Sequence, residues 1–363
     1  MTKLSKELKI RLVIFTILSV LICSSFFFYN SCETFINNLF YPSPVQNTKD
    51  CDLKVHFINV GQGDSIFIEL PDNKTMLIDA GPTDSQDELI FYLNNIFKNN
   101  ENRNIDYFVL THPDEDHIGG AVAVFDNFNV KFCYRPSVFT NNEIVQFGFD
   151  DVEVNNESHY ENTINKMYQE NCESFITFAT ENLFNLKDDC SYSIKFLAPL
   201  DERCTNSNDY SAVIMLEYNN KKFLFTGDAN SDIENRLVNL YKEELKADVI
   251  KVAHHGSNDS SSFDFLKYVK PSIAVISVEK DNLYNHPSKE TLERLKFCVK
   301  DKDILRTDVN GNIIIGVNLN QEIIVECQQN QLVEIYINWW CVVLFLECLC
   351  FGVIYFIKPK NKR

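Results

Sequence analysis

The chain has 363 residues, of which 45% are hydrophobic, so it is long enough for one large or two ordinary domains and is not globally disordered. Its 51 acidic and 34 basic residues give a formal net charge of −17, and such an acidic chain is not built to coat nucleic acid by bulk electrostatics. The sequence has no collagen period and no long Gly/Ser-rich or Pro-rich tract, which excludes a fibrous protein.

The first element in chain order is an uncharged apolar run at residues 12–29, which follows a basic N-terminus at residues 1–11. A run of this length just spans a hydrocarbon core of about 30 Å as a helix. The alternative is a signal peptide, but no small-residue cleavage site follows the run. We therefore expect an uncleaved transmembrane helix at 12–29.

A second apolar run at residues 335–357 precedes a basic tail at 358–363 and predicts a second transmembrane helix. Glu347 lies near its middle, where a carboxylate costs roughly 2.5–3.5 kcal/mol on insertion scales. The basic flanks of both runs predict that the two termini are cytoplasmic. We expect a two-pass protein of the cell membrane, with the lipid bilayer as a partner and the central part outside the cytoplasm.

Residues 30–51 are polar with two prolines, which indicates a linker, and residues 52–331 form the predicted domain. Alternating apolar positions predict two strands within 55–70 that turn at Gly61 and Gly63. This order of elements favours two sheets sandwiched between helices, an α/β fold, over a single parallel sheet. Further strands are expected at 74–81, 105–112, 192–199, 211–218, 221–228, 247–255 and 272–278, with helices at 87–98, 160–170, 231–245 and 289–298.

Most histidines lie in short motifs at predicted strand ends. The motif THPDEDHIGG follows the strand at 105–112 and places two imidazoles and three carboxylates in one six-residue turn. Without a cation these groups would repel one another, and mixed nitrogen and oxygen ligands suit zinc, manganese or iron. The alternative is a solvated acidic turn. The sequence therefore predicts a metal site at this strand end.

Three further motifs follow apolar strands. Asp228 ends FLFTGD and is predicted to bridge two metals, and the pair His254 and His255 follows ADVIKV. We favour His255 as the metal ligand and expect His254 to orient it or to contact substrate. His286 in NHPS is predicted to donate a proton to the leaving group, the alternative being a surface histidine.

The segments VGQGDS, LIDAG, THPDEDHIGG, NDYSAV, FTGD and HHGS, in this order, resemble the metallo-β-lactamase superfamily. More narrowly, residues 52–316 resemble the extracellular nuclease-like domain of ComEC-type competence proteins, which take up DNA. The resemblance implies an αββα sandwich with one or two divalent ions, zinc or manganese, that activate water for hydrolysis. It implies that the metal ligands are His112, Asp114, Asp116, His117, Asp228 and His255, that Asp116 also orients the nucleophile, and that Asp64, Asp79, Asn208, Ser211, His254 and Ser257 support them or contact substrate.

The chain departs from the superfamily motif HxHxDH, because Asp114 replaces its second histidine and the family's middle histidine is absent before the strand that leads to Asp228. Three functions then compete. The first is a phosphodiesterase or nuclease acting on DNA, which the acidic charge opposes and a lysine patch of Lys221, Lys222 and Lys251 would partly compensate. The second is a hydrolase of a small or envelope-linked phosphoester, and the third is a non-catalytic binding module. Protein partners are not indicated.

Overall fold

The computed structural model describes residues 48–328, except for 100–102, 150–151, 156, 180–190, 202–203 and 205. The predicted transmembrane segments 12–29 and 335–357 lie outside the described residues. Within the described part, no helix combines the length and the apolar character that a membrane crossing requires. Gln46–Gln329 form one compact unit. Thr48 and Cys51, which we assigned to the linker, are buried against it.

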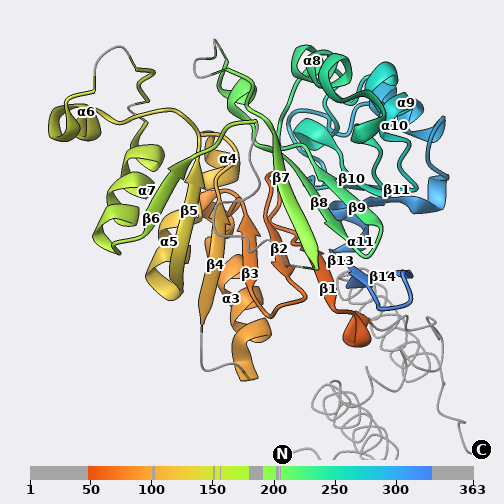
Figure 1. Ribbon diagram of the computed structural model, residues 1–363, viewed down its shortest axis with the longest axis horizontal. Helices are drawn as coiled ribbons and strands as arrows, with labels where there is room; N and C mark the ends of the chain where they lie inside the picture. The colour runs from red at the N-terminus through yellow and green to blue at the C-terminus, as the bar shows by residue number, and fades with distance from the viewer. Residues whose placement is uncertain are drawn as a thin grey trace, which may run out of the picture. The chain divides into compact units, whose positions relative to one another are not determined.

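The larger sheet of this unit contains eight strands in the order β14-β13-β1-β2-β3-β4-β5-β6 (Figure 1). The strands from β14 to β3 pair antiparallel, and those from β3 to β6 pair parallel. The bounds are β1 Leu53–Phe57, β2 Ile66–Glu69, β3 Thr75–Ile78, β4 Asn104–Val109, β5 Asn129–Arg135, β6 Glu173–Ile176, β13 Asn312–Val317 and β14 Ile323–Gln328.

The second sheet contains six strands in the order β12-β11-β10-β9-β8-β7. Its strands pair antiparallel from β7 to β9 and parallel from β9 to β12. The bounds are β7 Tyr192–Ala198, β8 Val213–Tyr218, β9 Lys221–Phe225, β10 Val249–Lys251, β11 Ile273–Ile276 and β12 Ile304–Arg306.

Helices cover the outer faces of both sheets (Figure 1). One group packs on the larger sheet: α3 Gln86–Ile96, α5 Ala121–Asn127 and α7 Ser158–Gln169. The other packs on the second sheet: α8 Ser231–Tyr241, α9 Phe263–Val269 and α10 Lys289–Lys296. Shorter helices occur in the connections: α4 Glu115–Ile118, α6 Asn141–Phe147 and α11 Thr307–Asn310. The predicted two-sheet sandwich between helices is therefore confirmed.

Three apolar cores hold these four layers together. Side chains alternate along each strand, so that Phe223 and Phe225 of β9 enter the core between the sheets while Leu224 packs under the second group of helices. Complete burial of each such side chain contributes about 1.5–3 kcal/mol. The same alternation leaves the strand ends free to carry polar residues.

Candidate metal centre

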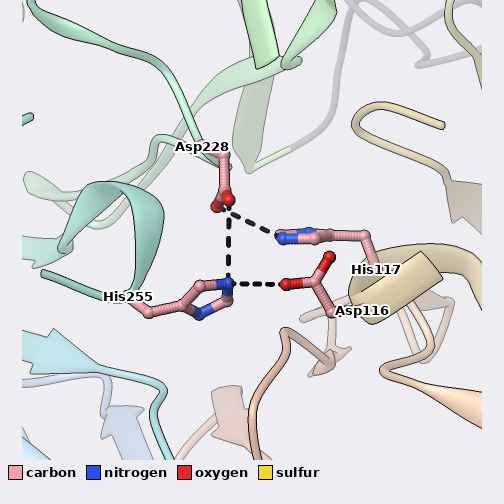
Figure 2. Close-up of side chains that lie close together, drawn as sticks. All are labelled: Asp116, His117, Asp228 and His255. Atoms are coloured by element: carbon pink, nitrogen blue, oxygen red, sulfur yellow. Dashed lines mark ion pairs between the residues drawn. The ribbon is translucent and has the colours of Figure 1, made fainter. Parts of the chain in front are cut away.

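The structure gathers the predicted motifs at one edge of the sandwich, because the parallel strands of both sheets end there. Four side chains from three connections place their ligand atoms within 4.8 Å of one another. We call this set, Asp116, His117, Asp228 and His255, the four-ligand cluster (Figure 2). Asp116 and His117 follow β4, Asp228 follows β9 and His255 follows β10.

The distances within the four-ligand cluster suit a shared cation. His117 Nε2 lies 3.2 Å from Asp228 Oδ1, and His255 Nε2 lies 3.3 Å from Asp116 Oδ2 and 3.6 Å from Asp228 Oδ2 (Figure 2). His117, His255 and Asp228 are buried and Asp116 is half-buried. The facing atoms of these three buried groups have no hydrogen-bond partner among the described residues. Because buried polar groups without partners are costly, this donor set fits a divalent metal ion.

Asp79, at the end of β3, orients His112 and His117, the histidines of the turn at residues 112–117, which we call the metal turn. Its carboxylate accepts hydrogen bonds from His117 Nδ1 (2.7 Å), from Thr111 Oγ1 (2.7 Å) and from Thr111 N (2.8 Å). Thr111 Oγ1 lies 3.0 Å from His112 Nδ1 and accepts a hydrogen bond from it, because the Thr111 hydroxyl already donates to Asp79. Both histidines are thereby held with the Nε2 lone pair facing the site.

His255 is fixed by a different device. Its Nδ1 donates to the carbonyl oxygen of Ser277 at 3.0 Å, which leaves Nε2 free for the cluster. The backbone of His254 and His255 is left-handed, with φ of 50° and 51°. Two consecutive non-glycine residues in this region are strained, and such strain is typical of functional sites.

Opposite charges lie close together in the four-ligand cluster and shift one another's pKa. Burial opposes ionisation, but the nearby carboxylates of Asp228, Asp79 and Asp116 raise the pKa of His117 well above its ordinary value. Burial by itself would raise the pKa of Asp228, but the charges of His117 and His255 hold it well below the usual range. The histidines thus compensate the carboxylates by proton uptake, and a divalent cation would replace those protons.

The other predicted ligands do not join the four-ligand cluster. His112 is fully buried with Nε2 unpartnered among the described residues, and burial together with neighbouring His117 lowers its pKa to about 4. Asp114 Oδ2 lies 3.7 Å from His112 Nε2 and accepts a hydrogen bond from Ser207 Oγ at 3.1 Å. Asn208 Oδ1 is buried and unpartnered within the described part. We call His112, Asp114 and Asn208 the His112 side.

A buried lysine lies beneath the centre, and it corrects one prediction. Lys251 is 1% exposed, and its Nζ lies 2.5 Å from Asp64 Oδ2. The other oxygen of Asp64 lies 3.5 Å from His255 Nδ1. The predicted lysine patch is therefore wrong, because Lys251 is an internal ion-pair partner. Lys221 and Lys222 face Asp248 and Glu217.

The remaining predicted residues lie around the cluster. Ser211 Oγ accepts a hydrogen bond from Asp228 N at 3.0 Å, and Ser257 N donates to His254 O at 2.7 Å. His254 Nε2 lies 3.7 Å from Asp228 Oδ2. His286 is half-buried, and its ring centroid lies 5.8 Å from that of His254. Sequence reasoning missed Thr111 and Ser277, whose only signal was their position at the ends of β4 and β11.

The αββα sandwich, with a set of buried donor atoms suited to a metal ion at its strand ends, is a metallo-β-lactamase fold. Residues 58–141 match the family model described as the metallo-beta-lactamase superfamily. This range includes Asp64, Asp79 and the metal turn.

Two bacterial proteins are similar to this chain in sequence. The chain is 28% identical over 280 residues to ComE operon protein 3 of Bacillus subtilis, with 72% of this chain and 32% of that protein aligned. It is 34% identical over 123 residues to competence protein ComA of Neisseria gonorrhoeae, covering 34% of this chain and 18% of that protein. The chain thus spans a third or less of the length of these relatives. With the family match, they confirm the resemblance to the ComEC-like branch of the superfamily.

Solved structures also align with this chain. The metallo-beta-lactamase fold protein YhfI of Bacillus subtilis has a TM-score of 0.40 and 12% identity, covering 70% of this chain and 95% of that one. Zinc-bound PqqB of Methylobacterium extorquens has a TM-score of 0.38 and 10% identity, covering 68% of this chain and 85% of that one.

Proposed function

We propose that the protein is a membrane-anchored, extracytoplasmic phosphodiesterase that uses a divalent metal, zinc or manganese, to cleave DNA. The observation that carries the proposal is the four-ligand cluster, whose buried nitrogen and oxygen atoms face one another within 4.8 Å. The relative in Neisseria gonorrhoeae is a competence protein, which supports a DNA-related substrate. The membrane anchoring rests on the apolar runs at 12–29 and 335–357.

The residues divide the work as follows. A bound divalent cation would supply Lewis acidity and lower the pKa of a water at the site. Asp116, the half-buried member of the cluster, would orient that water. Asp228 faces both histidines and closes the buried side. The ring of His254 lies beside that of His255, and the ring of His286 lies beside that of His254, with centroids 6.2 Å and 5.8 Å apart. His286 would donate the proton that the leaving group needs.

A second candidate, hydrolysis of a small or envelope-linked phosphoester, is supported by the charge of the molecule. Lys251 is internal, and Lys221 and Lys222 face acidic partners, so these residues provide no basic groove. DNA binding through phosphate contacts alone would therefore be weak. A small diester does not need such a groove.

The test is an assay of the full-length chain, stripped of metal and reloaded with manganese or zinc. Bis(p-nitrophenyl) phosphate and single-stranded DNA are the substrates, and Asp116→Ala is compared with Asp232→Ala, which removes an exposed carboxylate. We expect metal-dependent cleavage of both substrates, lost only in Asp116→Ala. Cleavage of the small diester alone would favour the second candidate. No bound metal and no cleavage would refute both.

A further inference from the structure

A loop beside the metal centre exposes two large apolar side chains. It connects β11 to α10, and we call its residues 279–286 the Tyr284 loop. Leu283 is 96% exposed and Tyr284 is 67% exposed, so neither contributes to the core. Adjacent exposed residues of this kind next to a reactive centre suggest a contact surface for a ligand.

The Tyr284 loop is tied at both ends to motifs of the metal centre. At its start, Glu279 N donates to Gln62 Oε1 of the VGQGDS motif at 3.3 Å. After its end, Ser288 N donates to Gly256 O of the HHGS motif at 2.9 Å. A Cβ on Gly256, whose φ is +85°, would lie 2.6 Å from Pro287 Cβ, so only glycine permits this contact. The loop position is therefore fixed relative to His255.

One side chain holds the inside of the loop. Asn282 Oδ1 accepts from the backbone N–H groups of Tyr284 (3.2 Å) and His286 (3.0 Å). Its Nδ2 donates to the carbonyl oxygens of Glu279 (2.9 Å) and His286 (2.7 Å). These four bonds use the full capacity of the amide. The exposed ring of Tyr284 is thus presented by an ordered loop, which lowers the entropy cost of binding.

Aromatic rings connect Tyr284 to the metal centre. The ring of Tyr284 stacks on His286 with centroids 5.7 Å apart and planes 20° apart. His286 in turn lies 5.8 Å from His254, whose Nε2 is 3.7 Å from Asp228. The same loop carries Lys280, which is exposed and has no ion-pair partner in the described part of the chain, although Glu279 and Asp281 flank it.

We propose that the Tyr284 loop is a stacking platform for an unpaired base next to the phosphodiester at the metal centre. This inference rests on the proposed phosphodiesterase function and specifies its substrate class as single-stranded nucleic acid. Base–aromatic stacking needs no basic groove, so it supplies affinity that this acidic chain does not gain from phosphate contacts. A base inside a duplex has both faces covered by its neighbours and does not fit such a platform.

The experiment compares Tyr284→Ala with Phe91→Ala, which removes a 70% exposed ring from α3 on the outer layer. The full-length, manganese-loaded chain is assayed on a single-stranded oligonucleotide and on an abasic oligonucleotide of equal length. We expect Tyr284→Ala to raise KM about tenfold on the base-containing strand, with kcat little changed and the loss confined to that strand. Tyr284→Trp should restore KM, and Phe91→Ala should match the wild type.

Stacking is read independently from quenching of 2-aminopurine in an oligonucleotide with hydrolysis-resistant methylphosphonate linkages. Quenching by the wild type that Tyr284→Ala abolishes supports the platform. Equal losses on both strands, or no change in KM and quenching, overturn it while leaving the phosphodiesterase in place. If the wild type cleaves neither strand, the proposed function fails, and the quenching result alone decides whether the loop binds bases.

Discussion

The two parts of the metal centre differ in how completely they surround a cation. The four-ligand cluster directs four ligand atoms at one point, and three of its side chains are buried. On the His112 side, His112 offers a buried nitrogen, but the side chain of Asp114 is 38% exposed and is engaged by Ser207. The difference indicates that the first metal ion binds at the four-ligand cluster and that the His112 side needs water or substrate to complete a second site.

The largest expected effect comes from Asp228→Ala, because Asp228 faces both histidines of the cluster. We expect bound metal and hydrolysis to fall to background, a greater loss than the roughly 10–100-fold that follows removal of a supporting partner. Metal content is measured by mass spectrometry, with Asp232→Ala as the control for loss of an acidic charge. Metal retained in Asp228→Ala would show that the cluster is not the binding site.

A smaller effect is expected from Asp79→Asn, which disturbs both parts of the centre. The amide nitrogen accepts no hydrogen bond: in place of Oδ2 it removes the acceptor of both His117 Nδ1 and Thr111 Oγ1, and in place of Oδ1 it removes the acceptor of Thr111 N. We expect about 10–100-fold weaker manganese binding by calorimetry. Thr111→Val removes the hydroxyl that links Asp79 to His112 but leaves the hydrogen bond between Asp79 and His117, so it should leave the first, tight binding step nearly intact. Equal losses in the two variants would remove the distinction between the two parts.

Asp114→His tests the comparison by gain rather than loss. It supplies the second histidine of the superfamily motif beside His112, whose Nε2 lies 3.7 Å from the present carboxylate. We expect bound zinc to rise from about one toward about two equivalents per chain, because imidazole is a stronger zinc ligand than a half-exposed carboxylate. Unchanged stoichiometry would mean that the His112 side is limited by something other than Asp114.

A buried carboxylate outside the centre affects the stability of the fold and has the smallest expected effect on metal binding and hydrolysis. Glu234 belongs neither to the four-ligand cluster nor to the His112 side, and burial raises its pKa to about 7 from an ordinary 4.5. The folded state therefore binds more protons than the unfolded state between these values, so stability falls as pH rises through that window. The loss is on the order of 3 kcal/mol, measured by urea unfolding of the metal-free chain. Glu234→Gln should flatten this slope, and an unaltered slope would contradict the assignment.

Much of the fold was predictable because many buried strands are recognisable in the sequence as runs of apolar residues. Strands such as β4 and β9 are nearly continuous apolar runs that end in polar motifs, and their helices carry clear periodicity. Both edge strands of the larger sheet were missed: β6 and β14 contain no fully buried residue, so neither gives a strong apolar pattern. The parallel strand β5 was also missed. Buried and exposed positions alternate only in its first half, so it shows neither a clear alternating pattern nor a continuous apolar run.

The candidate site was predictable residue by residue but not in its pairings. Each member of the four-ligand cluster lies in the connection after an apolar strand, so convergence at one edge followed from the order of strands; its metal-binding role stays a prediction. The ion pair between Lys251 and Asp64 was not predictable, because the two residues are distant in sequence and a lysine in a strand is ordinarily exposed. The contact between the end of the Tyr284 loop and Gly256 was not predictable either, because these segments are also distant in sequence.

The most direct test of the central claim is the metal stoichiometry of His255→Ala beside His112→Ala, measured on the full-length chain after reloading with manganese or zinc. Both variants remove one buried imidazole from the centre, but only His255 belongs to the four-ligand cluster. The account predicts that His112→Ala retains about one equivalent of metal and that His255→Ala retains almost none. Metal lost from His112→Ala but kept by His255→Ala would contradict it.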